Sequence, residues 1–327
     1  MRRKQPPLKI RISVLICVLI IPLPSLTAFA GGHDNLQTLL VGRIPIRLPR
    51  SMTGTEFAQT ILTAGKRQRE ESILKQLLEG NLPDRLRILK PVKISYSAEN
   101  GKGADLTIFV MPDYLSVGSD RDYILVPMGL HTALAVADTF GFILPTKKIV
   151  DIIFRNADCR MKPAPLPAGP LMRSTAYYQI HNRMIRDQSH ELSCSKNDLV
   201  SGHKKDVVLT NRLNNRQGKI AIYGWHRPSG IPIQSLSTVH GAEYADYSHG
   251  IRLVSETVLH DGKLKSIYDI LEHPGLANIL SDEGAIPKAR RIMTLQTKEP
   301  PATAHPNDLK DKNHLSANEM PGPTISH

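Results

Sequence analysis

The sequence predicts an α+β protein whose front half mixes helices with strands and whose back half consists mainly of strands. Two observations lead to this prediction. Stretches with helical apolar spacing and short strand-like apolar runs are interleaved before Cys159: 56–64, 70–80, 91–96, 106–111, 123–128 and 131–142. After Cys194 the apolar runs are mostly strand-like, and the elements do not show the strict alternation of a doubly wound sheet.

The predicted front-half elements begin and end at recognisable residues. Thr55 is the expected cap of the first helix, and Gly65 follows its end. The turn-rich stretch DYLSVGSDRD separates the second and third strands. Thr146 opens a further helix, in which apolar residues at helical spacing mark a buried face: Ile149, Ile152 and Ile153.

A proline-rich connector, KPAPLPAGP at 162–170, separates the two halves. It is short enough to be a surface excursion, so a single domain over 31–290 is favoured, while a division near the connector remains open. The elements expected after it are a helix at 178–188, strands at 206–210, 219–225 and 251–254, and a helix at 264–273. Residues 291–327 are rich in proline, asparagine and charge, and we expect them to be disordered.

The first 30 residues have the three parts of a secretory signal. Basic residues from Arg2 to Arg11 precede an apolar run, 14–21, and the stretch ends on Ala28-Phe29-Ala30. The run is shorter than the ~20 residues that a membrane-spanning helix needs. We therefore expect no stable membrane span, and a mature chain that begins near Gly31 and is secreted or periplasmic.

The net charge of the expected mature chain indicates which kinds of molecule it could bind. Without the first 30 residues the chain keeps 37 Lys and Arg against 30 Asp and Glu, a formal charge of +7. The basic residues are spread out and lack interleaved aromatic residues, which argues against a nucleic-acid partner. An anionic cell-wall polymer or peptide is the expected partner, with a solvated basic surface that binds nothing as the alternative.

Two cysteines remain after the signal, Cys159 and Cys194. In an oxidising compartment such a pair is expected to form one disulfide, which stabilises the fold by about 3–4 kcal/mol in the chain-entropy model. A catalytic thiol is the alternative, although neither cysteine lies next to the histidines described below.

Reactive side chains gather in the predicted β-rich half. Seven of the 13 histidines lie between His181 and His260. Four of them stand beside other polar or aromatic groups at the borders of predicted strands: His203 in SGHKKD, His226 in YGWHRPSG, His240 in STVHG and His249 in DYSHG. Loops on a rigid scaffold commonly hold binding residues, so we expect the four segments to meet in one polar site. Bonded turns and ordinary core packing are the alternative for each segment.

The crowded stretch 237–254 resembles the catalytic signature of L,D-transpeptidases, which crosslink cell-wall peptides outside the cytoplasmic membrane. His240-Gly241 is similar to the family's histidine–glycine pair, and Ser248-His249-Gly250 followed by Ile251-Arg252 is similar to its second element. The helix expected at 264–271 also follows this signature at about the distance at which the family places a helix. The family's cysteine, between Gly250 and Ile251, is absent. The resemblance spans about thirty residues and implies work on the cell envelope without the thiolate on which the family's acyl transfer depends.

Seven side chains are candidates for catalysis: His203, Lys205, His240, Asp246, Ser248, His249 and Arg252. In one mechanism His249 or His240 is a general base toward water and Asp246 orients it. Arg252 or Lys205 then stabilises the oxyanion of an amide or ester. In a second mechanism Ser248 is the nucleophile and takes its base from elsewhere, because its neighbour His249 would face the opposite way in an extended segment. The third uses zinc, the one cofactor considered, with four donors: His226, His240, His249 and Asp246.

The preferred function is hydrolysis of an amide bond in peptidoglycan or a related envelope polymer. The alternative is a noncatalytic protein that binds an envelope glycan or peptide. In either case the residues expected to contact the ligand are Tyr223, Trp225, His226, Tyr244 and Tyr247. Three acids in 112–123 have the donor type for calcium, but their spacing favours ordinary turn bonding: Asp113, Asp120 and Asp122.

Overall fold

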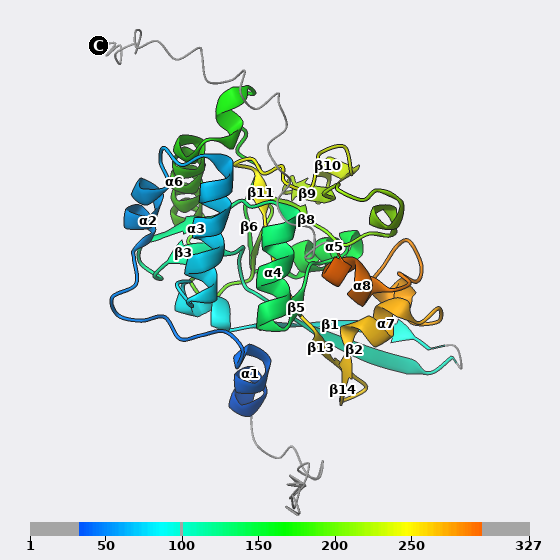
Figure 1. Ribbon diagram of the computed structural model, residues 1–327. Coiled ribbons are helices and arrows are strands. Elements are labelled where there is room, and N and C mark those ends of the chain that lie inside the picture. Colours follow the sequence, from blue (N-terminus) through cyan, green and yellow to red (C-terminus); the bar gives the residue numbers. More distant parts are fainter. Residues whose placement is uncertain (1–32, 99–100, 296–327) are drawn as a thin grey trace, which may run out of the picture.

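The computed structural model describes residues 33–98 and 101–295. Within these ranges the chain forms eight α-helices and four β-sheets, with most strands in the second half, which confirms the α+β prediction (Figure 1). The helices are α1 His33–Val41, α2 Gly54–Thr60, α3 Lys66–Leu78, α4 Leu130–Phe140, α5 Lys147–Asn156, α6 Thr175–Glu191, α7 Ile267–Glu272 and α8 Ala289–Leu295. The first six strands are β1 Lys90–Ser97, β2 Gly103–Val110, β3 Ser116–Gly118, β4 Tyr123–Leu125, β5 Phe142–Ile143 and β6 Cys159–Arg160. The others are β7 Val200–Ser201, β8 Lys205–Val207, β9 Ile222–His226, β10 Pro232–Ser237, β11 His249–Gly250, β12 Val254–Ser255, β13 Thr257–His260 and β14 Lys263–Ser266.

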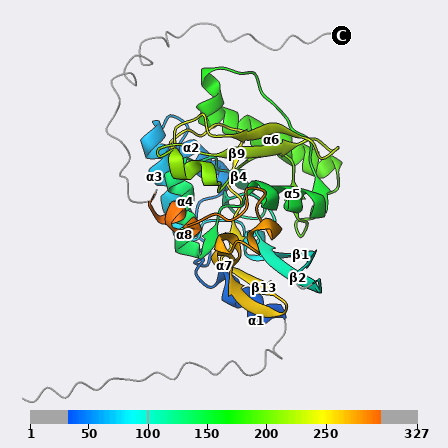
Figure 2. The ribbon, with the colours of Figure 1, turned by 90° about the vertical axis from the view of Figure 1, so that its right-hand side faces the viewer.

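Two of the sheets organise the fold. The larger has the order β14-β13-β2-β12-β5, with β1 also pairing with β2, and its central strand β2 buries Leu106, Ile108 and Val110. The second sheet has the order β10-β9-β8-β11. It lies between α6 and α5, since Trp225 of β9 contacts the ring of His181 on α6 and His226 stacks on Phe154 of α5 (Figure 2). The short pairs β3-β4 and β6-β7 complete the set within the described residues.

The front-half helices follow local sequence signals. For α2 the cap is Thr53 rather than the predicted Thr55, because the Thr53 side chain accepts from the backbone N–H of Glu56 while the Glu56 carboxylate accepts from the N–H of Thr53. This capping box sets the start two residues earlier. For α5 the prediction holds, since Thr146 caps the helix through the N–H of Ile149 and its apolar face is buried.

The predicted helix at 264–273 is only partly correct. Residues 263–266 form β14, which pairs with β13 in a hairpin, and α7 begins only after the cap Ser266. The hairpin turns at Asp261-Gly262, where both residues have positive φ, of 49° and 74°. An Asp-Gly turn of this type favours a tight hairpin, and its backbone pairing overrides the helical spacing of Leu264. The predicted strand at 251–254 is also interrupted, because pairing covers only Val254 and Ser255.

One continuous hydrophobic cluster contains residues from both sides of the proline-rich connector, including Phe57, Ile153, Val207 and Leu271. The helix α8 extends to Leu295, so an ordered element occupies the first residues of the predicted tail. The expected signal at 1–30 and the remainder of the tail lie outside the described residues. Among the described helices, none is long and apolar enough to cross a membrane.

A disulfide joins Cys159 of β6 to Cys194 just beyond α6, as predicted. It closes a loop of 35 residues that contains the connector and the whole of α6. Such a bond is consistent with a location outside the cytoplasm.

Candidate functional site

The second sheet brings three of the four histidine segments together. β8, with the HKKD sequence, pairs in parallel with β11, so that Lys205 lies opposite His249. On its other side β8 pairs with β9, which carries His226. The fourth segment joins through a backbone bond from the N–H of Ile220 to the carbonyl of His240. In Figure 1 these strands lie side by side in the upper part of the molecule.

His249 and His240 converge on Tyr244. The His240 ring stacks on that of Tyr244 with centroids 4.0 Å apart and planes 8° apart, and the Tyr244 ring is 5.6 Å from that of His249. The Tyr244 hydroxyl donates to Asp246 Oδ2 at 3.1 Å, and His249 Nε2 lies 3.9 Å from the same oxygen. His240 and Tyr244 are half-buried, whereas Asp246 and His249 are buried. The four side chains therefore form one group that reaches from the surface to a buried imidazole.

The turn 246–249 wraps around the carboxylate of Asp246. Both the N–H and the hydroxyl of Ser248 donate to Asp246 Oδ1, at 2.8 and 2.5 Å, and the N–H of His249 donates to the backbone carbonyl of Asp246. Burial by itself would raise the pKa of Asp246, but the nearby His249 and Lys205 and the bonds from Ser248 lower it overall. The carboxylate is therefore charged at neutral pH, and the Ser248 hydroxyl is already bonded to it.

His249 is the least satisfied group of the site. It is 1% exposed, and neither of its ring nitrogens has a hydrogen-bond partner. Burial lowers its pKa to about 4, although the charge of Asp246 acts in the opposite direction. At neutral pH the imidazole is therefore an uncharged base with an unbonded lone pair. Buried polar groups without partners are uncommon, and each calls for a functional or structural explanation.

Lys205 is a cation that acts on this group, because its charge lowers the pKa values of both Asp246 and His249. Its Nζ lies 5.0 Å from the centroid of the Trp225 ring, and the residue is half-buried. Burial lowers the pKa of Lys205, while the charge of Asp246 raises it. Trp225 itself is buried and has a φ of 57°, an uncommon conformation for a large side chain. That conformation follows Gly224, with a φ of 107°, and fits the ring beneath the lysine.

The structure places Arg252 and His203 in a different environment, around Tyr114. Arg252 is fully buried, donates to the carbonyls of Met111 and Val200 at 2.9 and 2.6 Å, and lies 4.2 Å from the centroid of the Tyr114 ring. His203 Nε2 lies 3.2 Å from Asp113 Oδ1. Within the described residues, neither side chain makes a hydrogen bond, ion pair or ring contact with His249 or Asp246. Arg252 is thus engaged in holding backbone carbonyls, not in facing the His249 group.

His226 also points elsewhere. Its Nε2 lies 2.9 Å from Asp151 Oδ1, which also accepts from the Tyr223 hydroxyl at 2.8 Å, and its ring stacks on Phe154 at 4.6 Å. The zinc donor set that includes His226 is therefore not assembled. No group of three His, Cys, Asp or Glu side chains suited to a metal ion occurs in the described ranges.

Three further residues predicted to contact the ligand, Tyr223, Trp225 and Tyr247, are buried in the protein. Tyr247 is 1% exposed, and its hydroxyl exchanges hydrogen bonds with the backbone of Leu166, which fixes the proline-rich connector. Tyr223 and Trp225 are likewise buried, at 4% and 5% exposure. Of the five residues predicted to contact the ligand, Tyr244 is half-buried and the other four are buried.

Lys204, next to Lys205 in the sequence, is a buried lysine. It is 1% exposed, and its Nζ donates to the carbonyl of Tyr247 and lies 3.1 Å from His181 Nδ1. Burial lowers the pKa of Lys204 to about 7. The next residue, Asp206, is also buried and accepts from the Tyr114 hydroxyl at 2.9 Å; burial raises its pKa to about 6. Sequence reasoning missed this layer because its partners lie on distant segments.

The three acids considered for calcium do not share a site. Asp113 pairs with Arg85 at 3.2 Å and with His203, Asp120 lies 3.7 Å from Arg85, and Asp122 accepts from the N–H of Thr55. Asp113 and Asp120 thus share the cation Arg85, whereas Asp122 bonds the first turn of α2.

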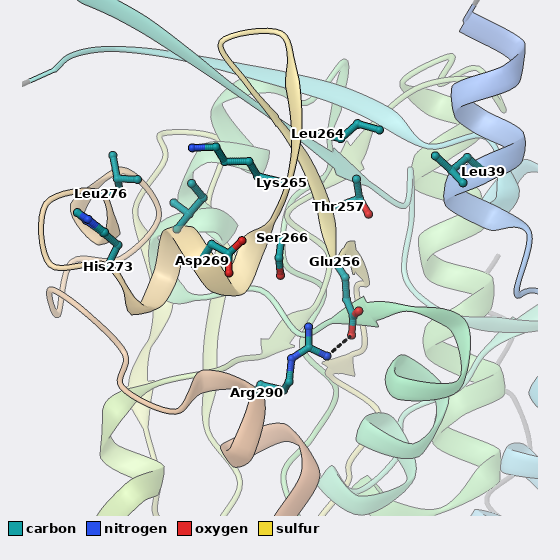
Figure 3. Close-up of a pocket in the computed structure, with 11 residues that line it drawn as sticks. Leu39, Glu256, Thr257, Leu264, Lys265, Ser266, Asp269, His273, Leu276 and Arg290 are labelled. Carbon is teal, nitrogen blue, oxygen red and sulfur yellow. Dashed lines mark ion pairs between the residues drawn. The ribbon is translucent and has the colours of Figure 1, made fainter. Parts of the chain in front are cut away.

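A separate open groove of about 760 Å³ lies between α1, β14, α7 and α8 (Figure 3). Its lining contains none of the predicted site residues and includes an ion pair between Arg290 and Glu256 at 3.9 Å. Comparisons with protein families, curated proteins and solved structures found no match for this chain.

Proposed function

We propose that the protein hydrolyses an amide bond in peptidoglycan or a related polymer of the cell envelope, with His249 as the general base. The observation that carries the proposal is the state of His249: a buried, uncharged imidazole with two unbonded nitrogens, next to a carboxylate and opposite a lysine. Titratable groups with strongly perturbed pKa values in such surroundings are typical of catalytic sites.

The reaction uses water as the nucleophile. His249 accepts a proton from a water molecule while the hydroxyl oxygen bonds to the amide carbonyl carbon. The charge of Asp246, 3.9 Å away, stabilises the imidazolium that forms, and the ammonium of Lys205 stabilises the oxyanion. When the carbon–nitrogen bond breaks, the imidazolium returns the proton to the leaving amine. The products are one carboxylic acid, which then releases its proton to solvent, and one amine, and His249 is again neutral.

Two of the alternatives from the sequence fit the geometry less well. A serine nucleophile would need its hydroxyl directed at a base, but the Ser248 hydroxyl donates to Asp246 at 2.5 Å. Arg252 was one of two candidates for the oxyanion, and its guanidinium is engaged with backbone carbonyls. Lys205 is the remaining candidate and lies opposite His249 in the sheet.

The envelope substrate rests on compartment, charge and resemblance. The secretory signal and the disulfide both fit an exported protein, either secreted or periplasmic. The formal charge of +7 on the expected mature chain suits an anionic polymer. The likeness of His240-Gly241 and Ser248-His249-Gly250 to the L,D-transpeptidase signature points to cell-wall peptide, and without the cysteine a water molecule takes the nucleophile's place.

The test measures the release of free amines from purified sacculi by residues 31–327, the expected mature chain. Wild type is compared with His249→Ala, His240→Ala and Lys205→Ala, and His190→Ala, an exposed histidine of α6, is the matched control. We expect the His249 and Lys205 variants to lose at least about 100-fold in rate and the control to match wild type. Absence of activity in wild type, or equal activity in all variants, contradicts the proposal.

One observation favours the noncatalytic alternative. The stacked rings of His240 and Tyr244 are both half-exposed and present an aromatic surface on which a sugar or peptide group could pack. If wild type binds sacculi without releasing amines and His240→Ala loses that binding, the protein is a binder.

A further inference from the structure

A second surface of the molecule has an unusual composition. Near the N-terminal end of the described chain, three large apolar side chains are exposed: Ile46 by 80%, Leu48 by 62% and Ile88 by 52%. Met52, exposed by 39%, extends the same region. We refer to these four residues as the N-terminal apolar patch. Large exposed apolar patches on proteins in water mark sites of interaction with other proteins or with membranes.

The patch is fixed in place by hydrogen bonds. Arg87 donates to the carbonyl of Pro45 at 2.5 Å, which joins the segment of Ile46 to that of Ile88. Arg47 donates to the side chain of Asn81 at 3.0 Å and to the carbonyl of Ser51 at 2.8 Å. Figure 1 shows this connection between α1 and α2 at the outer edge of the molecule. The exposed side chains thus belong to a defined surface.

The segment that carries Ile46, Leu48 and Met52 is positively charged. Residues 43–52 contain three arginines and no acidic residue. Arg43 is exposed and donates only to a backbone carbonyl, that of Asp138, so its charge is not neutralised there. Arg50 is exposed and makes no hydrogen bond or ion pair within the described residues. Apolar side chains flanked by arginines that form no ion pair suit a lipid bilayer, whose interior is apolar and whose headgroups carry negative charge.

The order of segments along the chain also favours a lipid surface as the partner of the patch. The apolar run 14–21 ends 12 residues before His33, the first residue of α1, and the patch follows directly after α1. As the predicted secretory signal, this run would bring the start of the mature chain to the lipid bilayer during export. Leu39 of α1, exposed by 57%, lies between that run and the patch, so the exposed apolar side chains that follow the run begin in α1 and continue into the patch.

We propose that the N-terminal apolar patch binds the surface of an anionic lipid bilayer. Ile46 and Leu48 enter the boundary between headgroups and acyl chains, and Arg43 and Arg50 contact lipid phosphates. The binding is peripheral and reversible, and it holds the protein against the membrane. It does not depend on the proposed hydrolysis, because no residue of the His249 group contributes to the patch.

The test is sedimentation of residues 31–327 with lipid vesicles, since these residues include every described residue and omit the apolar run that would itself bind lipid. We expect binding to vesicles of phosphatidylethanolamine with phosphatidylglycerol, and weak binding to phosphatidylcholine alone. The double variant Ile46→Ser/Leu48→Ser should bind about ten-fold more weakly or worse, and Arg50→Glu at least about five-fold more weakly. Raised salt should affect wild type more than Arg50→Glu.

The matched control is Ile231→Ser/Val239→Ser, which removes two apolar side chains of similar exposure, 58% and 71%, from a different surface. Its vesicle binding should equal that of wild type. An unchanged unfolding midpoint for each variant shows that the fold is retained. The proposal is overturned if wild type ignores anionic vesicles, or if Ile46→Ser/Leu48→Ser binds them as wild type does. It is also overturned if the patch variants only convert a dimer to a monomer in light scattering.

Discussion

Replacing His249 by leucine should stabilise the protein while abolishing its activity. The imidazole is 1% exposed and has two nitrogens without partners, so folding removes it from water with no compensating bond. An unsatisfied buried polar group costs about 1–3 kcal/mol. Leucine has a similar volume and no polar atom, so we expect the free energy of unfolding to rise by about 1–3 kcal/mol at pH 7.5. For a domain of this size, each kcal/mol raises the melting temperature by roughly 2–4 °C.

The same variant should change how stability depends on pH. The pKa of His249 is about 4 in the folded protein, against 6.5 for a free imidazole. Above pH 6.5 the ring is neutral in both states and its titration contributes nothing. As pH falls from 6.5 toward 4, the unfolded chain takes up a proton that the folded chain does not, so folding loses stability. This loss amounts to about 3 kcal/mol at most for His249 alone.

The assay is urea unfolding of wild type and His249→Leu at several pH values from 7.5 to 4.5. The difference between the two proteins isolates His249 from the other buried groups that titrate in this range. We expect the advantage of the variant to grow as pH falls, and the surface control His190→Leu to stay within about 0.5 kcal/mol of wild type. A variant less stable than wild type at pH 7.5, or a constant difference across the range, would refute the argument that the imidazole is buried at a cost.

Three other predictions follow from the same geometry. Gly250→Ala should destabilise by about 1–3 kcal/mol, measured by urea unfolding, since a Cβ there would lie 2.6 Å from the Tyr114 ring; no change would mean that the ring moves freely. Cys159→Ser/Cys194→Ser should lose about 4 kcal/mol for its 35-residue loop, measured by thermal unfolding with and without reductant, and an unaltered melting temperature would contradict this. Lys205→Met, which keeps the aliphatic stem over the tryptophan ring, should lower the rate of amide hydrolysis by at least about 100-fold with the fold intact, and a rate near that of wild type would remove the lysine from the reaction.

Local signals in the sequence were sufficient for much of the fold. The cap and apolar spacing of α5, the strands β1 and β2, and the disulfide between Cys159 and Cys194 were all predicted. The hairpin β13-β14 was missed because its apolar residues also match helical spacing, while the deciding signal was the Asp-Gly pair at 261–262. Competition between two local patterns is settled by pairing with a distant strand, here β2.

For the site, sequence proximity was a good guide only within one segment. His240, Tyr244, Asp246 and His249 lie within ten residues and do form one group. The direction of His226 is set by Asp151, 75 residues away, and no local pattern shows it. Likewise Lys204 contacts His181 of α6 and the carbonyl of Tyr247, both on distant segments, and no local pattern shows its burial. Contacts of this range need the tertiary structure.

The central claim is that His249 performs the hydrolysis, and the most direct measurement compares wild type with His249→Leu on the same sacculi at pH 7.5. The account predicts that wild type releases free amines, and that His249→Leu, although more stable, releases none above the buffer blank. Amine release by His249→Leu at the rate of wild type would contradict it.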